Sequence, residues 1–336
     1  MKLSVLDLVP VIEGGTVAQA LSDAAELAQT AEALGYHRYW VAEHHGMAGI
    51  AGGAVAVTLA HLGHATSTIR IGSGGIMLPN HSPLVIAEQF GTLDALFPGR
   101  IDLGLGRAPG ADQRIVTALR KDIHRAAEHF PADVVELRAL FAGDPRVTLQ
   151  ATPGLGANPQ MWILGSSLFG AQLAAMLGMP YAFASHFAPD HLDAALSLYR
   201  ERFEPSEALA RPHVMAAINV FAAPTDEEAV LIASSMDQSF VALRTGTPGR
   251  LPPPVPGYRA SLAPPASAML ERMREVSAIG SVETVARQLA AFQARTAADE
   301  IIVAGSTFDP AMRRRSLALT MDAVASLALG TNTEQV

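Results

Sequence analysis

The stretch that decides the predicted fold is residues 70–110, RIGSGGIMLPNHSPLVIAEQFGTLDALFPGRIDLGLGRAPG. Two apolar segments, Arg70–Met77 and Ile101–Leu105, are predicted strands that end in glycine-rich turns and bracket a predicted helix over 83–97. Glycine removes the side chain that would keep a flat ligand from the backbone, and Arg107 adds a planar donor fork suited to phosphate or carboxylate. Both turns follow strand C-termini and open on the same side, which predicts a ligand site there.

Strand-like and helix-like segments alternate on both sides of this stretch. The other predicted strands cover 3–8, 39–42, 161–164, 181–184, 213–221 and 300–304, with a peripheral strand at 146–150. The other predicted helices cover 16–34, 54–66, 112–142 with a break near Pro131, 168–177, 190–203, 226–244, 280–294 and 310–329. About eight strands, each followed by a helix, predict a single (β/α)8 barrel domain over 1–336, with a doubly wound sheet as the alternative.

One segment interrupts this alternation. Residues 245–265 contain seven prolines and three glycines, a composition that excludes a regular helix or an interior strand. Two interpretations are open: an extended surface connection, or a mobile lid over an active site, since long loops in compact domains are often functional.

Composition restricts the class of partner. The net charge of −8 argues against a general nucleic-acid or anionic-membrane binder, because both need a basic surface, and favours a small-molecule ligand. The absence of cysteine excludes disulfides and thiolate chemistry and fits the cytoplasm. The N-terminus lacks the apolar core of a signal peptide, and no apolar run reaches the roughly 20 residues needed to cross a bilayer.

A barrel enzyme places its site at the C-terminal ends of the strands. This rule selects the following residues, which we expect to converge on one face: Asp7, Glu43-His44-His45, Gly74-Gly75, Arg107, Gly165-Ser166-Ser167 and His186. The Gly165-Ser166-Ser167 turn opens a predicted helix, where free backbone N–H groups and the helix dipole favour an anion.

Two competing interpretations of these motifs are weak. Glu43-His44-His45 is a poor metal site, because adjacent ligands rarely share an ion without a third residue, so no metal is expected. The Gly104-x-Gly106 turn is similar to a dinucleotide fingerprint, but Ala108-Pro109-Gly110 stands where the phosphate-binding helix should begin. The histidines also have a plainer interpretation, as surface or helix-capping residues.

Four segments, in chain order, carry a resemblance to a known family. They are YWVAEHH at 39–45, the stretch from Ile69 to Arg107, WILGSS at 162–167 and ADEIIV at 298–303. Together they resemble the bacterial luciferase-like monooxygenases, which are flavin-dependent (β/α)8 barrels. The resemblance implies reduced FMN in the barrel mouth, a flavin C4a-peroxide formed with O2, and oxygenation of a small, largely apolar organic substrate. It also implies a separate flavin reductase and a homodimer.

The resemblance assigns roles to individual residues. His44 is similar to the family's active-site histidine, which acts as an acid or base, and neutral-range titration suits that role. Gly74-Gly75 matches a non-prolyl cis peptide beneath the flavin ring. Gly106-Arg107 and Ser166, with Ser167 beside it, match contacts to the FMN phosphate. Gly165 stands where luciferase has a carboxylate, so contacts to the ring there are expected from backbone alone.

Two other functions stay open at this point. A neighbouring branch of the family uses a deazaflavin coenzyme for hydride transfer without oxygen. A non-catalytic flavin-binding homologue would retain the glycine turns without turnover.

Overall fold

The computed structural model describes residues 1–107, 117–119 and 123–333. The Ala108-Pro109-Gly110 segment and most of the first third of the helix predicted over 112–142 therefore lie outside the described residues.

The described strands form one parallel sheet that closes into a barrel. They are β1 (Leu3–Asp7), β2 (Arg38–Val41), β3 (Arg70–Met77), β4 (Ile101–Gly106), β5 (Gln160–Gly165), β6 (Tyr181–Phe183), β7 (Val214–Ala222), β8 (Ser277–Gly280) and β9 (Glu300–Ala304). Pairing runs from β6 through β5, β4, β3, β2, β1 and β9 to β7, and β6 pairs with β7 to complete the ring. The predicted (β/α)8 barrel is confirmed.

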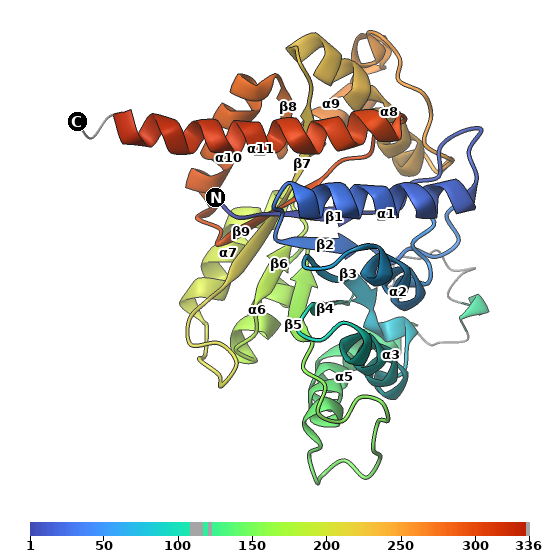
Figure 1. Ribbon diagram of the computed structural model, residues 1–336, viewed down its shortest axis with the longest axis vertical. Coiled ribbons are helices and arrows are strands. Elements are labelled where there is room, and N and C mark those ends of the chain that lie inside the picture. The colour runs from blue at the N-terminus through green and yellow to red at the C-terminus, as the bar shows by residue number, and fades with distance from the viewer. Residues whose placement is uncertain (108–116, 120–122, 334–336) are drawn as a thin grey trace.

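Helices cover the outside of the barrel (Figure 1). They are α1 (Val17–Ala33), α2 (Val55–Ala65), α3 (Pro83–Leu96), α5 (Ile123–Ala142), α6 (Leu168–Met176), α7 (Leu192–Glu201), α8 (Asp226–Arg244), α9 (Pro264–Arg274), α10 (Val282–Thr296) and α11 (Pro310–Thr333). Short 3-10 turns are η1 (Leu78–Asn80), η2 (Pro189–His191) and η3 (Tyr258–Ser261).

Local sequence signals explain several of these boundaries. Thr16 accepts a hydrogen bond from the Gln19 N–H while the Gln19 side chain bonds the Thr16 N–H, which is a capping box at the start of α1. Gly35 takes φ 81° just after α1 ends, a conformation that glycine adopts at low cost. Such residues made the predicted ends of this helix accurate.

The C-terminal third differs from the prediction. Pro264 and Pro265, predicted to be irregular, begin α9, because proline suits the first turn of a helix where its missing N–H has no partner anyway. The short strand β8 was missed, and it pairs with residues 219–222 of β7, beyond the part of β7 that pairs with β9. The predicted eighth strand, 300–304, is therefore β9 and completes the ring.

Two predictions around α5 are wrong. The helix continues through Pro131, because buried Phe130, Val134 and Leu137 hold both halves against the core. The peripheral strand expected at 146–150 does not form. The Asp144 carboxylate accepts hydrogen bonds from the Arg146 N–H and guanidinium, which turns the chain instead of extending it.

The barrel interior is layered. Alternate residues of a strand point inward, and one buried cluster contains the inward residues of the middle layers, including Leu6, Trp40, Trp162, Met215 and Ile302. The rings of Trp40 and Trp162 meet edge to face at 5.4 Å. They fill the centre of the barrel, so the interior below the mouth is packed.

The bottom layer is ionic. Arg38 donates to Asp102 at 2.8 Å and to Glu300 at 3.0 Å, and Arg70 donates to the other Asp102 oxygen at 2.5 Å. Ser4 also donates to Glu300. Burial acts to raise the pKa of Glu300, but His213, Arg38 and Ser4 outweigh it and lower the pKa to about 2. Glu300 therefore stays ionised, and the layer pairs two arginines with two acidic side chains.

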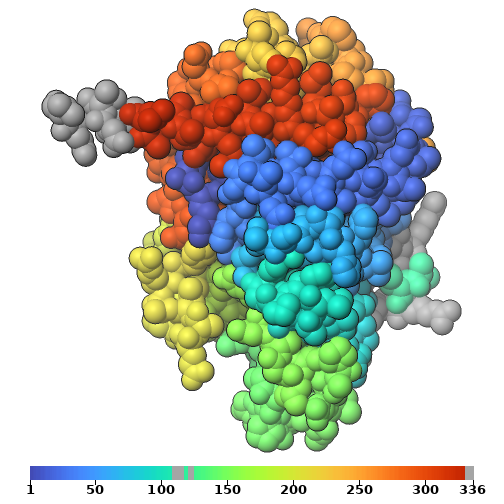
Figure 2. Space-filling model, viewed as in Figure 1, coloured from blue at the N-terminus to red at the C-terminus, as the bar shows by residue number. Residues whose placement is uncertain are grey.

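The two ends of the chain meet on one face. Figure 2 shows α11 lying along α1, and Arg314 of α11 pairs with Glu26 of α1 at 2.9 Å. Within the described ranges, none of the helices has both the length and the apolar character needed to cross a membrane.

Candidate active site

His44 lies in the uppermost inward layer of the barrel. It continues the inward series of β2 that contains Trp40 and Ala42. Its Nδ1 atom is buried and has no hydrogen-bond partner among the described residues. Burial lowers the pKa of His44 below its ordinary 6.5, and the nearby Glu43 carboxylate acts in the opposite direction. The imidazole is therefore neutral at pH 7 and able to accept a proton.

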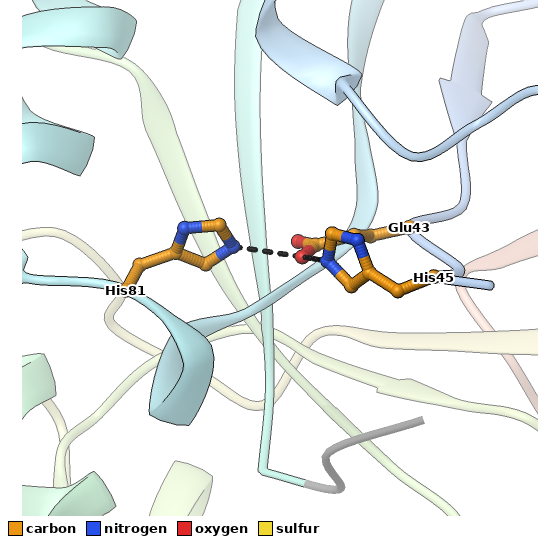
Figure 3. A group of neighbouring side chains, drawn as sticks. All are labelled: Glu43, His45 and His81. Atoms are coloured by element: carbon orange, nitrogen blue, oxygen red, sulfur yellow. Dashed lines mark hydrogen bonds and ion pairs between the residues drawn. The ribbon is translucent and has the colours of Figure 1, made fainter. Parts of the chain in front are cut away.

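The neighbours of His44 in sequence, Glu43 and His45, face the other way, because successive residues of an extended strand alternate in direction. Figure 3 shows the rings of His45 and His81 directed at the Glu43 carboxylate. Glu43 Oε1 lies 2.5 Å from His45 Nε2 and 2.7 Å from His81 Nε2, and Oε2 accepts the Met77 N–H at 2.9 Å. Burial acts to raise the pKa of Glu43, but these hydrogen bonds lower it, so the buried carboxylate is ionised.

This cluster has the residue types of a metal site. The ligand atoms of Glu43, His45 and His81 lie within 4.8 Å of one another, and His81 is the third residue that sequence analysis had not found. Both Nε2 atoms are directed at a single carboxylate oxygen, which is the geometry of two N–H donors sharing one acceptor. The contacts therefore describe a hydrogen-bonded network that ties the loop after β2 to the segment after β3.

The peptide bond between Gly74 and Gly75 is cis, as the resemblance implied. At Gly75 the neighbouring backbone leaves no room for a side chain, whereas at Gly74 the nearest atom is the movable end of a leucine side chain. A β-carbon would lie 2.6 Å from Leu6 Cδ1 at Gly74, and 2.7 Å from the Gly104 carbonyl oxygen at Gly75. Gly75, which sequence analysis attributed to ligand access, thus has a packing reason of its own.

The residues expected at the phosphate end lie together. The guanidinium of Arg107, after β4, stacks 4.1 Å from the ring centroid of Phe169, in the first turn of α6. Ser166 and Ser167 form the turn before that helix, and Tyr181 Oη donates to the Ser167 carbonyl at 3.3 Å. None of the described carboxylates forms an ion pair with Arg107 within 4.0 Å. A guanidinium that pairs with none of the described carboxylates, beside a helix N-terminus, is a suitable place for an anion.

Gly106 differs from the other glycines, because the protein leaves room for a side chain. A β-carbon there would lie 3.7 Å from the Ile76 carbonyl oxygen, whereas at Gly104 it would lie 2.3 Å from the Ser73 carbonyl oxygen. Because the resemblance implies that FMN lies against this turn, we expect Gly106→Ala to leave the thermal midpoint unchanged but to weaken FMN binding about tenfold, since the methyl group would occupy the space of the ligand. Fluorescence titration with FMN measures this.

Gly104→Ala is the matched comparison for that prediction and should reduce stability, since strand backbone cannot move aside. FMN affinity equal to wild type in Gly106→Ala would remove Gly106 from the site.

Asp7 does not face the barrel mouth, which corrects the expectation that all strand-end residues converge there. Its carboxylate accepts from Tyr39 Oη at 2.6 Å, from Arg313 at 2.7 Å and from the Val9 N–H at 2.9 Å. Ser4 and Leu6 of β1, and Leu8 just after it, take the inward positions, so alternation turns Asp7 outward toward α11.

The Pro-rich segment packs beside the mouth. Leu251 is buried and exchanges backbone hydrogen bonds with Val11 and Glu13, and Arg250 donates to the Gly15 carbonyl at 2.9 Å. The Val255 N–H donates to Ser234 Oγ on α8 at 2.8 Å. These contacts fasten the segment to the loop that follows β1.

Two further polar residues reach the uppermost layer. His186 follows β6, and its carbonyl accepts a hydrogen bond from Asn219 Nδ2 at 2.6 Å. Asn219 belongs to the inward series of β7 with Met215 and Ala217. Sequence analysis selected His186 by its place at a strand end but missed Asn219. The only available signal was a lone polar side chain within an apolar strand.

The chain belongs to the luciferase-like monooxygenase family, whose model matches residues 1–299. A protein of Escherichia coli K12 named luciferase-like monooxygenase is 49% identical over 95% of this chain and 96% of its own length. The N-acetyl-S-alkylcysteine monooxygenase of Bacillus subtilis is 39% identical over 73% of this chain and 75% of its own. The crystal structure of apo-MsnO8 is 34% identical and superimposes with a TM-score of 0.86, covering 96% of this chain and 98% of that one. The chain is thus an enzyme of this family.

More distant structures share the fold alone. One of them is the oxygenating constituent of 3,6-diketocamphane monooxygenase from Pseudomonas putida, solved in complex with FMN. It is 19% identical, with a TM-score of 0.73, and the match covers 97% of this chain and 98% of that one. Another is an F₄₂₀-dependent secondary alcohol dehydrogenase, which is 16% identical with a TM-score of 0.69. The match covers 96% of this chain and 98% of that one.

Proposed function

We propose that this enzyme uses reduced FMN and O2 to oxygenate a small, largely apolar organic substrate. The observation that carries the proposal is the placement of two complementary groups around one barrel mouth. A guanidinium that pairs with none of the described carboxylates lies beside the first turn of α6. A neutral imidazole, one of whose nitrogens has no hydrogen-bond partner among the described residues, lies above the packed interior.

The residues fit FMN at both ends. Arg107, Ser166, Ser167 and the backbone N–H groups that open α6 supply positive charge and donors for the phosphate. Gly106 leaves open backbone for close approach, and we place the ring near Gly74-Gly75 and Gly165. Reduced FMN, when bound, supplies the electrons that activate O2. His44 would hold or accept a proton beside the reacting atoms.

The experiment on the phosphate end compares two flavins. We expect Arg107→Ala to weaken FMN binding about 10- to 100-fold, because a charge-assisted contact to the phosphate is lost, and to leave riboflavin binding unchanged. The FMN affinity of Arg107→Lys should lie between those of wild type and Arg107→Ala, since lysine keeps the charge but lacks the planar fork. Equilibrium dialysis measures each affinity, and Arg146→Ala, on an exposed turn, is the control. Equal losses for FMN and riboflavin would contradict the phosphate role.

The alternative is hydride transfer with a deazaflavin coenzyme, which the shared fold of an F₄₂₀-dependent enzyme keeps open. The two functions separate in one assay. Substrate-dependent oxygen consumption with reduced FMN supports the monooxygenase, and anaerobic turnover with reduced deazaflavin supports the alternative. Bound flavin without either activity would indicate a non-catalytic flavin-binding protein.

We propose that residues 245–265 act as a lid that keeps water from the reacting atoms. Their contacts to the loop after β1 place them beside the mouth. We expect FMN together with substrate to slow proteolytic cleavage within this segment severalfold, measured by mass spectrometry of the fragments. Cleavage at an unchanged rate would favour a static connection. The separate flavin reductase, the homodimer and the cytoplasmic location stay predictions.

A further inference from the structure

The uppermost layer of the barrel contains buried polar side chains that the proposed function does not use. Besides His44 Nδ1, the atoms His186 Nδ1 and Asn219 Oδ1 are buried and have no hydrogen-bond partner among the described residues. Asn219 as a whole is 1% exposed. Buried polar atoms in proteins are nearly always hydrogen-bonded, so a group of unused ones indicates a place for a polar group of a ligand.

The three side chains lie at the same end of the barrel. His44 follows β2 and His186 follows β6, and these strands are four positions apart in the closed ring, so the residues face each other across the mouth. Burial, and to a smaller degree the His44 imidazole, lower the pKa of His186 to about 4, so His186 is neutral at pH 7. Asn219 lies on β7, which pairs with β6.

The orientation of the Asn219 amide is determined by its neighbour. Its Nδ2 donates to the His186 carbonyl oxygen at 2.6 Å, and a carbonyl oxygen can only accept. The amide oxygen therefore points the other way, and none of the described residues donates to it. The neutral imidazole of His186 can donate or accept at Nδ1, according to its tautomer. The unmet requirement of this pair is thus a ligand that donates at least one hydrogen bond.

We propose that Asn219 and His186 bind the polar head of the substrate, and that this head carries an N–H or O–H donor, as in a secondary amide or an alcohol. The inference rests on the proposed function, because it concerns the same mouth. Leu8 and Leu164, partly buried and just below this layer, would contact the apolar remainder. A site built to bond a donor discriminates strongly against an analogue that lacks it, because its own polar groups are then left unpaired.

The barrel offers a flavin-independent way to test this. The protein has two tryptophans, Trp40 and Trp162, and both lie in the interior below the layer, so their fluorescence can report occupancy of the mouth. FMN-free protein is titrated with two matched pairs of probes. N-hexylacetamide is compared with N-hexyl-N-methylacetamide, and 1-heptanol with its methyl ether. We expect wild-type protein to bind the donor member of at least one pair about tenfold more tightly. The pair that discriminates identifies the head as amide or alcohol.

Variants connect that preference to the named residues. In Asn219→Leu the affinities for the donor probe and its matched analogue should differ by less than about twofold. Asn158→Leu, at an exposed position, should keep the wild-type preference. Because Asn219→Leu also removes the bond to the His186 carbonyl, circular dichroism checks its fold, and His186→Phe, which keeps that carbonyl, should also reduce the preference. Lack of preference in wild-type protein for either pair overturns the proposal, as does a full preference in folded Asn219→Leu. Neither result affects the FMN test with Arg107→Ala.

Discussion

Replacing His44 by alanine should lower substrate-dependent oxygen consumption by about 100- to 10,000-fold, the range expected when a general acid or base is removed. FMN affinity should change less than about twofold, because the phosphate residues lie at the ends of β4 and β5 and are untouched. Stopped-flow measurement of product formation under saturating reduced FMN gives the rate, and fluorescence titration gives the affinity.

The pH dependence separates a chemical role from a structural one. The pKa of His44 lies below 6.5 because of burial, so the wild-type imidazole stays neutral as pH falls to 6.5 and is protonated only below it. The wild-type rate should therefore fall at a pH below 6.5, and this step should be missing in His44→Ala. His61→Ala, on the exposed side of α2, is the control and should match wild type. A His44→Ala variant that keeps more than about a tenth of the rate would contradict the assignment.

The second large effect is expected at the opposite end of the barrel. Asp102→Ala should reduce the free energy of unfolding by about 3–5 kcal/mol, because it leaves buried charges without their counter-ion. Asp102 accepts hydrogen bonds from Arg38 at 2.8 Å, from Arg70 at 2.5 Å and from Trp40 Nε1 at 2.9 Å, and its side chain is fully buried. Urea unfolding followed by tryptophan fluorescence measures the loss.

An exposed ion pair provides the comparison for Asp102. Asp190 pairs with Arg272 at 2.8 Å, but both side chains are more than half exposed, so Asp190→Ala should cost less than about 1 kcal/mol. Similar losses for the two variants would show that the bottom layer does not carry the stability assigned to it. FMN affinity of folded Asp102→Ala should match wild type, since the packed tryptophan layer separates the two ends.

Local patterns made most of the fold predictable from sequence. The bounds of β3 and α8 agree with those predicted, because each begins and ends at clear signals such as the Thr225 cap of α8. The features that sequence analysis predicted wrongly have weak local signals. β8 has only four residues, and its pairing with β7 depends on contacts about 58 residues away in sequence. Pro131 was interpreted by its propensity alone, which buried neighbours override.

The residues of the site divide in the same way, into those with a local sequence signal and those without one. His44, Arg107 and Ser166 follow strands at recognisable positions, so motif and fold together could select them. His81 and Asn219 could not be selected in this way. His81 contacts Glu43 from 38 residues away, and Asn219 stands inside a strand whose other members are apolar. The role of Asp7 was also unpredictable, because its partner Arg313 lies 306 residues later.

The pairing of Asp7 with Arg313 has a consequence for how the protein is made. The first strand completes its hydrogen bonds only with β9, and its buried carboxylate gains its cation only from α11. A ribosome adds Arg313 306 residues after Asp7, so an emerging chain carries an open barrel edge and a carboxylate without its partner until then. The barrel can therefore close only after β9 and α11 have been made, and until then the edge of β1 is open to pairing with other chains.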